Sequence, residues 1–196
     1  MAAIDLYWLP LGAGGRFVRF NGRLYEAIRA RLEHREPLDL YHTALIVTLS
    51  EERFVVENAW PIPDDDARSR GVIVEGSVGT PLLGRLRAFR YEIRCWPGGT
   101  ISDLASAIGG PQRISDDESH SLRLLELVGD VPPLLWGRCP APGEEMWNSN
   151  SVISWLLERS GIDARSIRPP PGGRAPGWST GIERAGVPPR REGIAV

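Results

Sequence analysis

One histidine and one polar run in this sequence have the residue types that acyl chemistry requires. His42 stands near the beginning of an apolar, β-branched stretch at residues 41–49, whereas His34 and His120 lie among polar residues. A neutral imidazole on a strand can accept a proton from a hydroxyl or a thiol, so we single out His42 as a candidate general base. The alternative is a half-buried histidine with a purely structural role.

The polar run covers residues 145–151, contains Ser149 and directly precedes an apolar helical pattern. A serine at such a place accepts hydrogen bonds from the first free N–H groups of the helix, which stabilises the helix by about 1 kcal/mol. Ser149 as a plain helix cap is therefore one interpretation. The other is a nucleophile, because the positive end of the helix dipole and nearby N–H groups can hold an oxyanion.

Three other motifs indicate less chemistry. Residues 12–15 (Gly-Ala-Gly-Gly) lack the third glycine of a dinucleotide fingerprint, since Phe17 stands there, and predict a flexible loop after a short strand. Residues 64–66 (Asp-Asp-Asp) lack the alternating ligands of a calcium loop and predict a solvated acidic loop. Cys95 and Cys139 are too few for a disulfide framework, and the prolines after Cys139 make it a poor nucleophile. We expect neither a metal nor a cofactor.

The strands are expected in the first half of the chain, after one helix. Apolar residues at helical spacing predict a helix over residues 23–32. The run at 41–49 and the Phe-Val-Val at 54–56 predict a β-hairpin. Residues 71–76 predict a third strand, and the alternation at 86–96 predicts a fourth strand or a pair.

Helices are expected again in the second half. Residues 102–108 predict a short helix, and Ser115 begins a capping-box pattern that predicts a helix to about residue 128. Residues 147–160 predict a helix that ends at Gly161 and is apolar around most of its circumference, so we expect it deep in the core. The order of helix, strands and helices predicts an α+β fold in which a small antiparallel sheet packs on helices.

Length and composition indicate a small soluble protein. The chain has 196 residues, is 42% hydrophobic and carries a formal net charge of −2. We therefore expect one α+β domain over residues 1–168 and no nucleic-acid partner. Residues 169–196, rich in Pro, Gly and Arg, predict an irregular C-terminal extension. The acidic N-terminus and the absence of a long apolar run predict a cytoplasmic protein with no integral membrane segment.

Two segments together resemble a known family. Residues 41–47 (Tyr-His-Thr-Ala-Leu-Ile-Val), followed by a strand with Glu57, resemble the circularly permuted papain-like group, the NlpC-type permuted enzymes. Residues 147–151 (Trp-Asn-Ser-Asn-Ser), which precede a buried helix, resemble it as well. In that group the strand histidine precedes the helix nucleophile, and a polar residue on the next strand orients the histidine. The resemblance covers the order of elements over residues 41–160.

The resemblance implies hydrolysis or acyl transfer at an amide, an ester or a thioester. Ser149 would be the nucleophile, His42 its general base and Glu57 the orienting group. The side chains expected to contact the ligand are Trp147, Asn148 and Tyr41. We also expect Trp155 in the core and Trp147 partly lining a cleft, with Trp8, Trp60 and Trp178 as candidates for its further walls.

The nucleophile is the point at which this chain departs from the family, because serine stands where the family has cysteine. A serine hydroxyl does not ionise near neutral pH and needs a well-placed base. Ser149 is thus a working variant, a relic in a fold that has lost its chemistry, or a deliberate substitution. The alternative function is an inactive binding module for a peptide, lipid or acyl ligand. A third is an interaction protein that uses the Arg-bearing strand and the Pro-rich tail.

Overall fold

The computed structural model describes residues 1–11, 26, 30–32, 34–61, 71–101 and 103–187. The expectations for residues 12–15 and 64–66 lie outside these ranges. Of the helix expected at 23–32, the four residues described (26 and 30–32) are helical. No helix among the described residues has the length and apolar content needed to cross a membrane.

A single antiparallel sheet is the centre of the fold, with strand order β4-β5-β3-β2-β1-β6. Its strands are β1 Ala3–Pro10, β2 Asp39–Leu49, β3 Glu52–Ala59, β4 Val72–Ser77, β5 Arg90–Pro97 and β6 Gln112–Ser115. The two-residue strand β7, Gly173–Arg174, pairs in parallel with the start of β2. The hairpin expected from residues 41–56 is confirmed as β2 and β3, which pair in antiparallel register.

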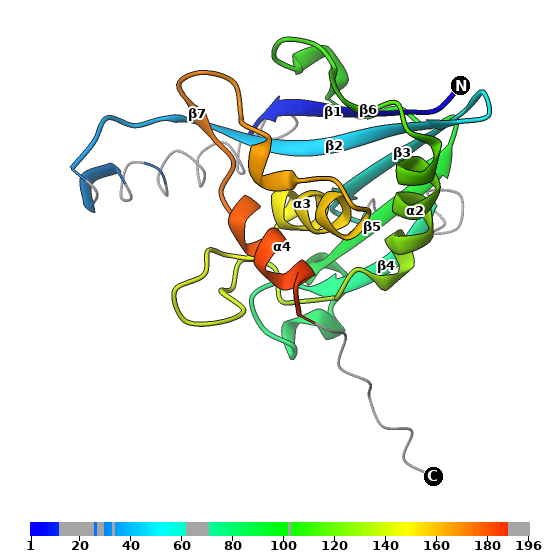
Figure 1. The fold of residues 1–196 in the computed structure, drawn as a ribbon. Helices are drawn as coiled ribbons and strands as arrows, with labels where there is room; N and C mark the ends of the chain where they lie inside the picture. The colour runs from blue at the N-terminus through cyan, green and yellow to red at the C-terminus, as the bar shows by residue number, and fades with distance from the viewer. Residues whose placement is uncertain (12–25, 27–29, 33, 62–70, 102, 188–196) are drawn as a thin grey trace.

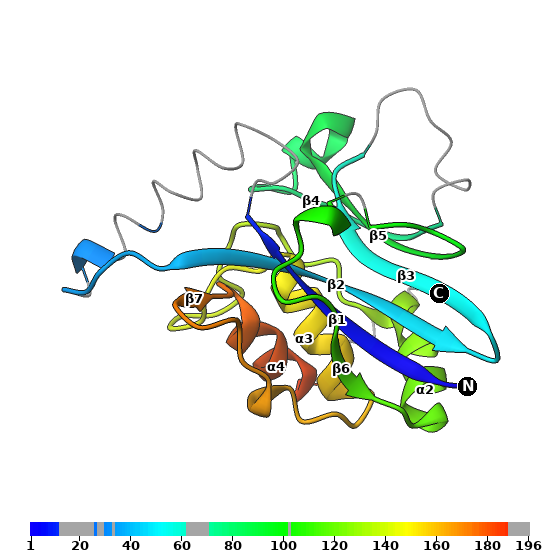
Figure 2. The same ribbon diagram turned by 90° about the horizontal axis from the view of Figure 1, so that it is seen from above.

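Helices cover one face of this sheet (Figures 1 and 2). They are α2 Glu118–Leu127, α3 Ser149–Arg159 and α4 Trp178–Ala185. Together with the strands they confirm the α+β prediction. The apolar side chains of α3 pack on the sheet residues that alternate toward it, and its central residues Val152, Ile153 and Leu156 are fully buried. The all-round apolar pattern therefore predicted the depth of α3 correctly.

A smaller core lies on the opposite face of the sheet. Ala44 and Ile46 of β2 join Leu9 of β1 in a second apolar cluster, which Ile101 covers. The segment that begins with Ile101 includes the 3-10 turn η3, Leu104–Ser106, and is tied to β1 where Ile108 N–H donates to the Trp8 carbonyl at 2.9 Å. The helix expected at 102–108 is thus only this single turn.

Two element boundaries differ from the predictions. Residues 87–89 form a 3-10 turn and Leu86 a bend rather than strand, because the β5 ladder begins at Arg90. Ser115 is the last residue of β6, and Asp117 caps α2 by accepting a hydrogen bond from Ser119 N–H at 2.7 Å. Both errors move an element end by a few residues, which is the scale on which local patterns are least informative.

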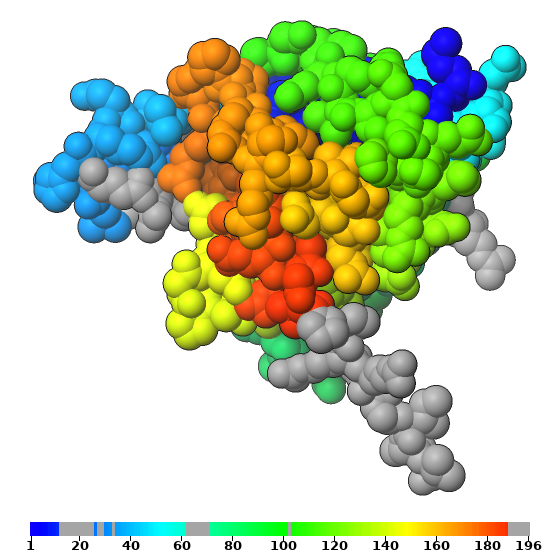
Figure 3. Space-filling model, viewed as in Figure 1, coloured from blue at the N-terminus to red at the C-terminus, as the bar shows by residue number. Residues whose placement is uncertain are grey.

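The expected C-terminal extension is wrong as far as residue 187. Residues 173–174 pair with β2, and α4 buries Ile182 and Ala185 in the main core. In the space-filling view α4 (red) lies flush with the surrounding surface (Figure 3). The part of the chain rich in Pro, Gly and Arg therefore belongs to the domain, and residues 188–196 lie outside the described ranges.

Candidate functional site

Asn148, and not Ser149, is the N-cap of α3. Its side-chain oxygen accepts from the N–H groups of Asn150 and Ser151, at 2.9 and 3.3 Å. The Ser151 hydroxyl accepts from Asn148 N–H in return, which completes a capping box. Ser149 is the first helical residue, and its hydroxyl makes no hydrogen bond with any described residue. The plain-cap interpretation of Ser149 is therefore wrong.

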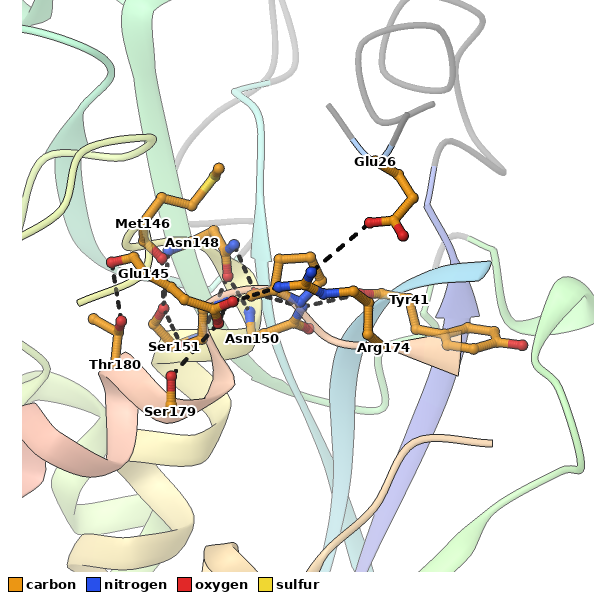
Figure 4. Close-up of polar contacts among 12 residues, drawn as sticks. Glu26, Tyr41, Glu145, Met146, Asn148, Asn150, Ser151, Arg174, Ser179 and Thr180 are labelled. Carbon is orange, nitrogen blue, oxygen red and sulfur yellow. Dashed lines mark hydrogen bonds and ion pairs between the residues drawn. The ribbon is translucent and has the colours of Figure 1, made fainter. Parts of the chain in front are cut away.

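Asn150 joins the first turn of α3 to β2 (Figure 4). Its amide donates to the carbonyls of Tyr41 and Pro176, both at 2.9 Å, and its side-chain oxygen accepts from the Thr43 hydroxyl at 3.0 Å. Pairing of β2 with β3 stops at Leu45, opposite Val56 in β3, so the earlier residues of β2 lack that neighbour. The helix end occupies this position and contacts both chain neighbours of His42.

Glu145 anchors the chain that returns over α3. Its carboxylate accepts from Arg174 at 2.5 Å and from Gly177 N–H at 2.6 Å, while its carbonyl accepts from the Thr180 hydroxyl at 2.9 Å (Figure 4). Gly177 has a φ of +83°, and a Cβ there would stand 2.5 Å from the Met146 carbonyl oxygen. Only glycine fits this close approach.

Most of the polar run at 145–151 therefore holds the fold together. Glu145, Asn148, Asn150 and Ser151 each make at least two hydrogen bonds that join segments distant in sequence or cap α3. Ser149, 6% exposed, is the polar residue of this run without such a partner in the described ranges. Ser149 therefore differs from its polar neighbours in that its side chain does not help to hold the described fold together.

His42 points to the sheet face opposite α3. Side chains alternate along a strand, and those of Tyr41 and Thr43 lie on the α3 face. Leu9, the β1 residue opposite His42, belongs to the second apolar cluster. Burial lowers the pKa of the His42 imidazole, and the Asp103 carboxylate partly opposes this by raising it. The ring is therefore neutral at neutral pH, the form a general base needs.

Glu57 lies on the same face as His42 but interacts with an arginine. The pairing of Leu45 with Val56 places Glu57 on the face of Ala44. Its carboxylate is 3.6 Å from the Arg94 guanidinium, and the structure contains no hydrogen bond between Glu57 and His42 among the described residues. Burial raises the pKa of Glu57, while Arg94 lowers it.

Sequence reasoning missed the charged residues around Glu57. Arg94 donates to Glu92 from two nitrogens, at 2.9 and 2.7 Å, and to the Trp60 carbonyl at 2.7 Å. Glu92 and Arg94 are 1% and 4% exposed, so this is a buried ion-pair group across β3 and β5. Asp103 at the start of η3 is the nearby carboxylate without a hydrogen bond or ion pair in the described residues. The sequence pattern that could have indicated this ion-pair group is the alternation of arginines with apolar residues at 86–96.

The structure thus brings the three expected catalytic residues to one region without joining them. His42 and Glu57 share a sheet face, whereas Ser149 begins a helix on the other face, at the position where β2 and β3 separate. No hydrogen bond connects Ser149 with His42 among the described residues. For the orienting role, Asp103 is a better candidate than Glu57, because Arg94 already pairs with Glu57.

The residues expected to contact a ligand are instead structural. Trp147 is fully buried in the main core, and Tyr41, 5% exposed, packs edge-on against Trp8 at 6.4 Å. The side chain of Asn148 is used by the helix cap. Trp155 lies in the core as predicted, and Trp60 is 44% exposed. A cleft lined by Trp147 is therefore excluded.

No family model, curated protein or solved structure gives a significant match to this chain.

Proposed function

We propose that the protein catalyses hydrolysis or acyl transfer at an amide, an ester or a thioester, with Ser149 as nucleophile and His42 as general base. The observation that carries this proposal is the Ser149 hydroxyl at the N-terminus of α3, which has no hydrogen-bond partner in the described part of the chain and lies beside the strand segment of His42. The neighbouring polar side chains all have structural hydrogen bonds. A hydroxyl at this position is free to react, and the positive end of the helix dipole favours negative charge beside it.

The first turn of α3 also supplies a donor for the developing oxyanion. Asn148 accepts from the N–H groups of Asn150 and Ser151, and Val152 N–H donates to the Asn148 carbonyl. The N–H of Ser149 is the one in this turn without a partner among the described residues. It can donate to the carbonyl oxygen that the Ser149 hydroxyl attacks, assisted by the positive end of the helix dipole.

The proposed reaction follows from these two groups. The Ser149 oxygen bonds to the substrate carbonyl carbon while its proton passes to the neutral imidazole of His42. The same proton then goes to the leaving amine, alcohol or thiol, and an acyl-serine remains. Water or a second nucleophile releases the acyl group. Because the ring points away from α3, the imidazole must rotate toward the gap between β2 and β3 for the first step.

The proposed fold group is the permuted papain-like one. Support comes from the order of the elements: a strand with a histidine, its antiparallel neighbour with an acid, and a later buried helix whose N-terminus contacts the first strand. The second candidate function is a binding module of the same fold without turnover. The lack of a hydrogen bond from Ser149 to His42 in the described residues favours this candidate.

Thiol reactivity after Ser149→Cys tests the proposal. A thiol at the helix N-terminus near His42 should react with iodoacetamide at neutral pH about tenfold faster than the exposed Cys139, which serves as internal reference. Cys95 should be nearly inert, because burial raises its pKa to about 11. His42→Ala in the same background should slow the reaction at position 149 and leave Cys139 unchanged.

Substrate turnover provides the second measurement. Wild-type protein should form an acyl-enzyme or be labelled by a fluorophosphonate, and Ser149→Ala should abolish both. Equal alkylation of position 149 and Cys139, with or without His42, together with no labelling of the wild type, would overturn catalysis and favour the binding module. Ser151→Ala is not a suitable control, because Ser151 holds Gly177.

A further inference from the structure

The segment that connects β4 to β5 holds large apolar side chains out to solvent. Its leucines and phenylalanine, Leu82, Leu83, Leu86 and Phe89, are 69%, 37%, 58% and 39% exposed. Isolated exposed apolar residues are ordinary on a protein surface, but here four lie within eight residues of one segment. Figure 1 shows this segment at the lower edge of the molecule, away from α3 and β2.

The backbone of the segment that carries these exposed side chains is held in place by hydrogen bonds. Two 3-10 turns, η1 Leu83–Arg85 and η2 Arg87–Phe89, hold the backbone through local hydrogen bonds. The Gly84 carbonyl accepts from Arg90 at 2.7 Å, and Val78 N–H donates to the Phe89 carbonyl at 2.9 Å. The backbone is thus fixed in a shape that presents its apolar side chains outward.

The charge of the segment has one sign. Between Ser77 and Glu92 there are three arginines, at positions 85, 87 and 90, and no acidic residue, although the whole chain has a net charge of −2. Arg90 lies 3.4 Å from Glu75 in β4, and Arg85 is exposed. A partner that accepts this segment must therefore combine an apolar interior with negative charge at its surface.

An exposed tryptophan lies at the base of the segment. Trp60 is 44% exposed and packs on Trp136 with ring centroids 6.1 Å apart. The backbone of Trp136 is bonded to Ser77 and Gly79, where the segment begins. Tryptophan is enriched at the boundary between lipid and water, because its ring is apolar and its N–H is polar.

We propose that residues 82–89 dock the protein onto an anionic lipid surface. Leu82, Leu86 and Phe89 enter the boundary between headgroups and acyl chains, while the long apolar stem of Arg85 lets its charged end remain at the phosphate level. A lipid surface is favoured over a protein partner because the exposed apolar side chains occur together with arginines and no acidic residue between Ser77 and Glu92, and because the exposed Trp60 lies at the base of the segment. The proposal does not depend on the activity of Ser149.

Co-sedimentation with vesicles tests this docking. Full-length protein should bind vesicles of phosphatidylcholine mixed with phosphatidylserine, and bind pure phosphatidylcholine vesicles several-fold more weakly. Leu82→Ser combined with Leu86→Ser should reduce partitioning at least about tenfold. Arg85→Gln should reduce it about fivefold on anionic vesicles only, and added salt should remove that difference.

A matched control separates docking from general surface hydrophobicity. Leu122 on α2 is 44% exposed and lies outside the segment, so Leu122→Ser should bind anionic vesicles as the wild type does. Circular dichroism and thermal melting check that every variant is folded. Absence of binding, or equal loss in Leu122→Ser, would overturn the proposal. A dimer in light scattering that the double leucine variant abolishes, without vesicle binding, would assign the segment to a second copy of the chain.

Discussion

On the sheet face that carries α3, the polar side chains at the start of α3 are joined by hydrogen bonds to β2 and to the returning chain, whereas on the opposite face His42 and Asp103 make no side-chain hydrogen bond among the described residues. Asn150 makes three hydrogen bonds and Glu145 anchors the returning chain. On the other face the bonded group is Arg94 with Glu57 and Glu92. His42 and Asp103 are half-buried, and a titratable residue whose pKa is shifted by burial and by a neighbouring carboxylate is one to examine for function.

Arg94→Met should produce the largest effect. The variant leaves the carboxylates of Glu57 and Glu92 without their arginine, and breaking a buried ion pair costs about 3 to 5 kcal/mol of unfolding free energy. The loss should shrink in mildly acidic buffer. A carboxyl whose pKa is raised in the folded state stabilises that state at low pH, and this contribution is lost as pH rises through the raised pKa.

Urea unfolding of the Arg94 variant at several pH values measures this effect. Glu57→Gln in the same background should recover part of the lost stability, because it removes one uncompensated charge. A deficit that is constant from acidic to neutral pH would mean that packing of the arginine stem, and not its charge, is what the variant loses.

On the α3 face, two neighbouring residues provide a matched pair. Asn150→Ala should cost about 3 kcal/mol, because it leaves the Tyr41 carbonyl and the Thr43 hydroxyl buried without their partner. Ser149→Ala should cost less than about 0.5 kcal/mol, since the hydroxyl has no bonding role. Chemical denaturation of both variants gives the comparison. Similar losses would mean that Ser149 also supports the helix end.

The contrast between these neighbours also indicates what the sequence could predict. The β2–β3 hairpin and α3 were predictable, because β-branched runs and all-round apolar helices are local patterns. The cap was misassigned by one residue, since Asn148 and Ser149 are both good caps and only the backbone geometry distinguishes them. The helix α4 was missed because its stability comes from burial of Ile182 and Ala185 against α3, not from local propensity.

The site was less predictable than the fold. Which residues meet in the site depends on the sheet face that each side chain occupies and on the pairing register of the strands. That register is set by many strand residues together. The sequence shows Glu57 and Arg94 as residues 37 positions apart, and only the pairing of β3 with β5 places them opposite each other. Asp103 comes to the region because η3 packs on the second apolar cluster, which no local pattern near residue 103 indicates.

Acid should destabilise the protein partly through His42. Burial lowers its pKa in the folded state, so at a pH just below its unfolded value the unfolded chain binds a proton that the folded chain does not. Stability is therefore full above about pH 6.5 and falls as pH decreases through the lowered pKa, by at most about 1.4 kcal/mol per unit. His42→Gln should flatten the pH dependence of the unfolding free energy measured in this range.

The smallest expected effect tests whether Asp103 acts on His42. Asp103→Asn keeps the size of the side chain and removes a charge that raises the imidazole pKa, so the pKa of His42 should fall further. Nuclear magnetic resonance titration of the His42 ring measures this directly. If Asp103 also orients the ring for proton transfer, Asp103→Asn should slow alkylation at position 149 in the Ser149→Cys background, and Asp103→Glu should restore part of the rate. An unchanged His42 titration would remove Asp103 from the site and leave Glu57 as the carboxylate to examine.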